Sequence, residues 1–159
     1  MEKKELFRTL LVKAVKTLVV LFTLVAMGWF VGQLPYAQAL PFFSDKLPVS
    51  VFISSVVSLL AVAVFVKFGS EAGAPVAGLL DFVPKAGDIF GNLSRILALL
   101  FSYYAFQEAV FPFIENYEWV YQSFFLGFTL FFLARAGLLV YNASEELSRF
   151  LLSAINPQK

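Results

Sequence analysis

Two long apolar runs, residues 93–114 and 119–141, are separated by a four-residue link that contains Glu115 and Glu118. At about 1.5 Å per helical residue, each run is long enough to cross a hydrocarbon core of roughly 30 Å. A water-soluble domain of 159 residues needs a polar face on every helix, but these runs have none, and the chain is 60% hydrophobic and 14% charged. The two runs therefore predict a helical hairpin that spans a membrane.

Two further apolar runs, residues 17–34 and 49–68, precede this hairpin. Together the four runs predict a single all-α membrane domain over residues 1–159, a polytopic protein with four transmembrane helices. Residues 69–92 contain five glycines and two prolines, which predict a Gly-rich cytoplasmic loop. Such a loop is either a short interfacial or re-entrant piece or a mobile connection.

Amphipathic segments flank the four runs. Residues 1–16 combine basic side chains with an apolar stripe, so they either lie on an anionic leaflet or simply begin the first span. Residues 142–159 form a second amphipathic segment, which either continues the fourth helix or bends along the surface. An even number of spans places both termini on one side. That side carries most of the Lys and Arg, so the positive-inside rule predicts cytoplasmic termini.

Composition narrows the possible chemistry. The chain has neither Cys nor His, which removes disulfides, thiolate and imidazole metal sites, and any catalytic triad with a histidine base. The net charge is +1, and a nucleic-acid-binding protein needs a concentrated basic surface. We therefore expect a protein that is not an enzyme, with no cofactor, no metal and no nucleic-acid partner, and with the lipid bilayer as its surroundings.

Small residues recur at helical spacing and predict faces where helices pack closely. One is the GxxxG spacing of the first run, and others lie on the third and fourth runs. The predicted helix-packing residues are Gly28, Gly32, Ala98, Ser102, Ala105, Gly127, Ala134 and Gly137.

Two ionisable residues lie inside the predicted spans, where such groups are functional candidates by default. Arg135 is within about six residues of the end of its run, so its guanidinium can reach phosphate headgroups, and we expect it to bind them. Glu108 is too far along the opposite helix to pair with Arg135 within one hairpin. It is therefore neutral, bonded to a Tyr or Gln, or exposed to water.

Two functions fit these features. The first is a homo-oligomeric channel or transport element for ions or small solutes, in which small-residue stripes hold the copies together. Its candidate pathway residues are Ser54, Ser58, Glu108, Glu115 and Glu118. The alternative is a non-catalytic interaction or assembly subunit of a larger membrane complex, in which the same stripes bind other membrane subunits.

Overall fold

The computed structural model describes residues 3–42 and 44–155 and is all-α apart from a small hairpin. Four of its helices are long and apolar enough to cross a membrane, which confirms the predicted fold class. The long helices, in chain order, are α1 (Lys3–Gly32), α3 (Val49–Leu79), α4 (Ala86–Val110) and α5 (Glu118–Ile155).

Short elements connect the long helices at one end of the molecule. Between α1 and α3 the chain forms helix α2 (Pro35–Ala39) and two antiparallel strands, β1 (Pro41–Phe42) and β2 (Ser44–Pro48). The ring of Phe42 stacks on that of Phe52, with centroids 3.8 Å apart, and this contact anchors the hairpin to α3. Between α4 and α5 lies the short 3-10 helix η1 (Phe111–Phe113), which begins where Pro112 interrupts the α-helical hydrogen bonds.

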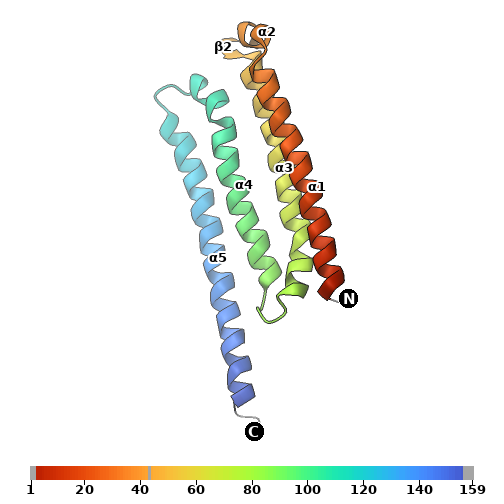
Figure 1. Cartoon of the computed structure of the whole chain (residues 1–159). Helices are drawn as coiled ribbons and strands as arrows, with labels where there is room; N and C mark the ends of the chain where they lie inside the picture. Colours follow the sequence, from red (N-terminus) through yellow and green to blue (C-terminus); the bar gives the residue numbers. More distant parts are fainter. Residues whose placement is uncertain (1–2, 43, 156–159) are drawn as a thin grey trace.

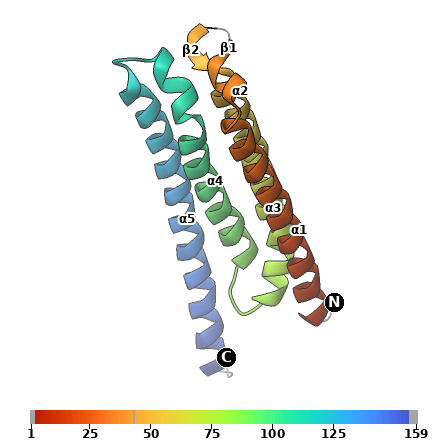
Figure 2. The ribbon, with the colours of Figure 1, turned by 45° about the horizontal axis from the view of Figure 1, so that its top comes forward.

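The four long helices form an open row in which each packs against the next long helix of the chain (Figure 1). α1 packs on α3, α3 on α4, and α4 on α5, and successive helices run in opposite directions. A second view shows α1 and α5 at the two ends of this row (Figure 2). Both ends of the described chain lie on the same side, as four spans require. The fold is a layer of helices and not a closed bundle.

This arrangement exposes far more surface than a soluble fold of the same mass. The accessible surface is 11141 Å², whereas a compact water-soluble monomer of this mass exposes about 7,900 Å². Large apolar side chains such as Phe22, Trp29 and Phe131 are exposed, and the buried residues are mainly Ala, Gly and Ser. Lipid is the solvent that suits such a surface. We therefore describe the chain as an integral membrane protein with four candidate spans.

The structure differs from the prediction of a Gly-rich loop over residues 69–92. Helix α3 continues to Leu79 and α4 begins at Ala86, so the connection is short, residues 80–85. Glycine lowers helix propensity in water, but in a membrane the helix satisfies every backbone group, and glycine allows two helices to approach closely. That tertiary contact overrides the composition on which the loop prediction was based.

Pro75 lies inside α3 without ending it. Proline has no backbone N–H, so the carbonyl of Glu71, four residues earlier, loses its helical donor. The Nζ of Lys13 on α1 donates to that carbonyl oxygen at 3.4 Å, and it also pairs with the Glu71 carboxylate at 3.3 Å. A neighbouring helix thus supplies the hydrogen bond that the proline removes.

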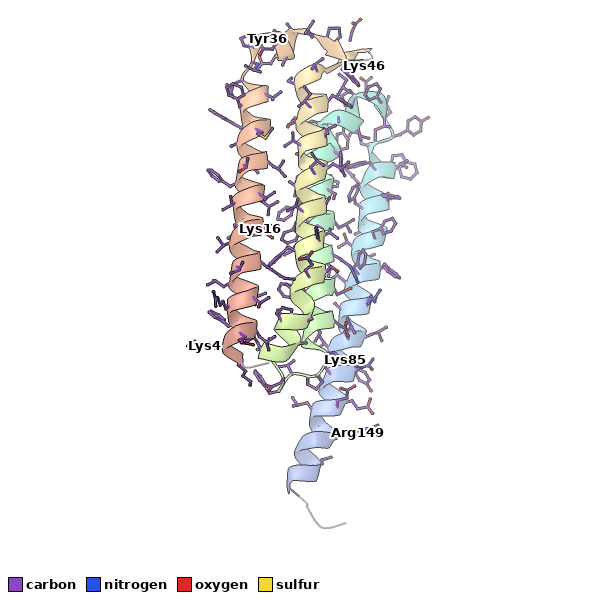
Figure 3. All side chains as sticks on the ribbon, turned by 90° about the vertical axis from the view of Figure 1, so that its right-hand side faces the viewer. Lys4, Lys16, Tyr36, Lys46, Lys85 and Arg149 are labelled. Carbon is purple, nitrogen blue, oxygen red and sulfur yellow. The ribbon has the colours of Figure 1, made fainter. Side chains whose placement is uncertain are left out.

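Both amphipathic segments are continuous with their neighbouring spans. α1 runs without a break from Lys3, so the N-terminal segment begins the first span, and α5 runs to Ile155. Residues 1–2 and 156–159 of these predicted segments lie outside the described residues. With 38 residues, α5 is about 57 Å long. Its last turns, which carry Arg149, project beyond the other helices (Figure 3).

Candidate functional site

The closest helix contact is a crossing of α3 and α4 that is built from glycine, and we call it the glycine crossing. Gly69 and Gly73 on α3 face Gly87 and Gly91 on α4. A Cβ atom added to Gly87 would lie 2.4 Å from the carbonyl oxygen of Gly73, and one added to Gly69 would lie 2.4 Å from Cβ of Ser94. A Cβ at Gly87 would clash with backbone and one at Gly69 with the Ser94 side chain, so the backbones of α3 and α4 touch most directly at Gly73 and Gly87.

The sequence carries a signal for this crossing that the loop prediction missed. Both 69–73 and 87–91 have the GxxxG spacing, the same pattern that drew attention to Gly28 and Gly32. These two patterns are separated by about two helical turns and a short connection, which suits an antiparallel helix hairpin. Their polar neighbours and the two prolines suggested a loop instead.

Polar and aromatic side chains join α4 to α5. Asn92 is only 1% exposed, and its Nδ2 donates to the carbonyl oxygen of Phe132 at 2.8 Å. Farther along the helices, the hydroxyl of Tyr121 donates to the carbonyl oxygen of Tyr103 at 2.7 Å, and the two rings lie 5.3 Å apart. The contact stripe of α5 is therefore bulky in this region, with Phe125 beside Tyr121.

The predicted packing residues of α1 and α4 differ in how closely they approach α3. Ala98 is buried, and the carbonyl oxygen of Ala105 accepts a hydrogen bond from Ser55 Oγ of α3 at 3.4 Å. The hydroxyl of Ser102 donates within its own helix to the carbonyl oxygen of Ala98. A Cβ on Gly28 would meet Val57 at 3.5 Å, an ordinary contact, whereas one on Gly32 would meet no described atom within 4 Å.

Small residues along one side of α5 are exposed in the single chain. We call Ser123, Gly127, Ala134 and Gly137 the small-residue face of α5. A Cβ on Gly127 or Gly137 would have no described atom within 4 Å. Within this chain α5 uses other residues to pack on α4. The predicted packing role of the small-residue face is therefore not filled by another helix of the described residues.

The predicted pathway residues do not gather along one route in the single chain. Ser58 lines a cavity of about 470 Å³ between α1, α3 and α4, whose other lining residues are apolar except for Tyr104. Ser54 is half-buried beside α1, and Glu108 is exposed on α4 without a hydrogen bond or ion pair from the described residues.

The remaining two pathway candidates, Glu115 and Glu118, lie at the end of the molecule where α4 is connected to α5. The carboxylate of Glu115 forms an ion pair with Nζ of Lys46 at 3.2 Å. This pair joins the α1–α3 connection to the α4–α5 connection. Lys46 also donates to the carbonyl oxygen of Pro112. Glu118 is exposed at the first position of α5, where a negative charge suits the helix dipole.

At the opposite end, ion pairs hold the short α3–α4 connection to its neighbours. Lys3 at the start of α1 donates to the carboxylate of Asp81 at 3.0 Å, and this hydrogen bond lowers the pKa of Asp81 below its ordinary value. Lys85 pairs with Glu146 of α5 at 3.2 Å. The connection therefore contacts both ends of the row through exposed charges.

Arg135 is exposed on α5 and lines a cavity of about 450 Å³ between α3, α4 and α5. Lys85, Asp88 and Arg95 also line this cavity. Sequence reasoning singled out Arg135 alone and missed Arg95, which is placed at the start of an apolar run and could have been found by the same argument.

The described residues hold no group of three or more acidic side chains that is suited to a metal ion. Comparison with protein-family models, with curated proteins and with solved structures finds no match to this chain. A functional proposal therefore depends on the geometry of the chain itself.

Proposed function

We propose that this chain is a non-catalytic assembly protein of the membrane that binds a second copy of itself through the small-residue face of α5. One observation carries the proposal: Gly127 and Gly137 have open space where a side chain would be, on a helix at the edge of the row. Foreign membrane subunits are the alternative partners.

The way helices associate in lipid explains why a small-residue face can bind another helix. Lipid tails are as apolar as leucine, so helices associate by close van der Waals contact, and small residues permit that contact. The chain already uses this device in its own glycine crossing. Gly127 and Ala134 are seven residues apart, the spacing that recurs along one seam of two helices that cross at a shallow angle. Two parallel α5 helices related by a two-fold axis place these residues against each other.

The test replaces both glycines with a bulky residue. The variant Gly127→Leu/Gly137→Leu should keep the fold, because a Cβ at either position meets no described atom within 4 Å and leucine favours the helix. Gly32→Leu is the matched control, since Gly32 also has open space but lies on α1. Förster transfer between labelled chains in vesicles measures association. The wild type and the control should associate, and the double variant should be monomeric.

Two results would contradict self-association. One is a wild-type chain that stays monomeric as the protein-to-lipid ratio rises, and the other is a double variant that associates like the wild type. A monomeric wild type that retains another protein from native membranes, and loses it in the double variant, would support assembly with a foreign subunit instead.

A channel formed by several copies is the second candidate, and the position of Glu108 favours it. A carboxylate exposed in a candidate span, without a partner among the described residues, needs water or another subunit around it. In a ring of copies Glu108 would face the axis, with Ser54, Ser58, Glu115 and Glu118 as the other pathway residues. Ion flux into proteoliposomes should then fall in Glu108→Gln and Ser58→Leu, and unchanged flux would remove this candidate.

A further inference from the structure

We propose that the cavity between α3, α4 and α5 binds the phosphate group of an anionic lipid headgroup. Its basic lining comes from three parts of the fold: Lys85 from the α3–α4 connection, Arg95 from α4 and Arg135 from α5. The cavity measures about 450 Å³, within the range of pockets that hold small ligands, about 300–1,000 Å³. It is separate from the small-residue face of α5 and does not depend on self-association.

The two arginines are available to a ligand. Lys85 already pairs with Glu146, but neither Arg95 nor Arg135 has an ion pair or hydrogen bond with any described residue. Arginine presents a planar fork of donors that matches the oxygen atoms of a phosphate. Two unpaired guanidinium groups that line one cavity are therefore the chemistry that recognises a phosphate.

The fold holds these two arginines at the same cavity by a nearby hydrogen bond. Asn92 on α4 donates to the carbonyl oxygen of Phe132 on α5 at 2.8 Å. Arg95 lies three residues after Asn92, and Arg135 lies three residues after Phe132. Because α4 and α5 are antiparallel, the two arginines lie on opposite sides of this hydrogen bond along the helix axis. Their long side chains can thus approach one ligand from two directions.

The glycine crossing creates the space beside the arginines. Gly69, Gly73, Gly87 and Gly91 all line the cavity, so part of its wall is backbone without side chains. Asp88 also lines it, in the first turn of α4. A carboxylate repels phosphate but accepts hydrogen bonds from hydroxyl groups. A headgroup in which a phosphodiester is joined to a group with free hydroxyls, such as glycerol, can bind both the arginines and Asp88.

The depth of the cavity favours a lipid over a soluble phosphate. Gly69 is 20 residues from the start of α3 at Val49, and this distance along the helix is about 30 Å, the thickness of the hydrocarbon core. Arg95 is 18 residues from the end of η1 at Phe113, and Arg135 is 17 residues from the start of α5 at Glu118, or about 26 Å. On each of these helices the cavity is thus about one hydrocarbon thickness from the opposite end of the helix, where long arginine side chains can reach the headgroups.

The experiment compares lipid binding by native mass spectrometry of the full chain. The wild type is exchanged into vesicles of phosphatidylcholine and phosphatidylglycerol in equal parts, extracted, and scored for the lipid retained. We expect preferential retention of phosphatidylglycerol. The variant Arg95→Gln/Arg135→Gln should lower the apparent affinity at least about tenfold, because each arginine gives a charge-assisted hydrogen bond. Arg149→Gln, which removes one positive charge outside the cavity, should retain the lipid as the wild type does.

Further arms identify the source of the phosphate and protect the test from a folding defect. Arg95→Lys/Arg135→Lys keeps both charges but loses the planar forks, so its affinity should lie between those of the wild type and the glutamine variant. Binding of inorganic phosphate to lipid-depleted protein, lost in the glutamine variant, would support the same site with a soluble ligand. Equal retention of both lipids by the wild type, with no phosphate binding, would overturn the proposal. Retention by the glutamine variant equal to that of Arg149→Gln would overturn it as well.

Discussion

The glycine crossing makes a quantitative prediction about two residues that face each other across it. In Gly69→Ala the new Cβ would lie 2.4 Å from Cβ and 2.8 Å from Oγ of Ser94, so α3 and α4 must move apart. The contact is with a side chain and not with backbone. Removing that side chain in Ser94→Gly should therefore make room for the alanine, so the double variant carries a small side chain on α3 and none on the facing position of α4.

The expected energies follow from two terms. Overpacking at Gly69→Ala costs about 2 kcal/mol, and the better helix propensity of alanine returns about 1 kcal/mol, so the single variant should be destabilised by about 1 kcal/mol. Ser94→Gly should cost about 0.5 kcal/mol from propensity alone. In the double variant the overpacking disappears and the propensity terms nearly cancel. The coupling energy between the two sites should therefore be about 2 kcal/mol, in the favourable direction.

The measurement is a double-mutant cycle on the free energy of unfolding in mixed micelles, with the helix content of each variant checked by circular dichroism. Gly137→Ala is the matched control, because its Cβ meets no described atom within 4 Å, and it should be neutral or slightly stabilising alone and additive with Ser94→Gly. Additivity of Gly69→Ala and Ser94→Gly to within about 0.5 kcal/mol would refute the direct contact.

Three further outcomes test other contacts. Gly87→Ala should destabilise by about 2 kcal/mol and should not be rescued by any side-chain deletion, because its Cβ would meet backbone at 2.4 Å; unfolding free energies check this. The pKa of Asp81 is lowered in the folded state by Lys3, so this pair stabilises the fold above the ordinary carboxyl pKa of about 3.9 and is lost as the pH falls through the lowered value. The protection factors of the backbone amides in the second turn of α1 should accordingly stay constant from neutral pH to about pH 5 and fall as the pH drops below about 3.9, with no such fall in Asp81→Asn. Breaking the exposed Lys46–Glu115 pair should cost less than about 1 kcal/mol and the cost should vanish at high salt, as unfolding at two ionic strengths will show.

The spans could be predicted because hydropathy and length alone define them. Four apolar runs predicted four helices, and each run lies wholly or mostly within one long helix. The termini of the helices could not be predicted in the same way. The segments beyond the runs are polar enough to leave the lipid, and nothing in their composition shows whether a helix continues into water, as α5 does to Ile155.

The contact faces were harder to predict than the helices. The glycines of residues 69–92 have poor helix propensity, and only the partner helix makes their helical conformation favourable. On α5 the small residues suggested the packing face, but within the chain Tyr121 and Phe125 pack on α4. Spacing shows which residues share a face. It does not show which neighbour that face meets, because the order of helices in the row is a property of the whole fold.

The order of helices in the row is the same as their order in the chain. Each helix that enters the bilayer during synthesis can dock on the one made just before it, and no later helix has to be threaded between two earlier ones. Most contacts therefore close over short stretches of chain, which favours rapid folding. The seam between α3 and α4 joins an early hairpin to a late one. A defect at that seam would leave two intact hairpins that fail to meet, and not an unfolded polypeptide.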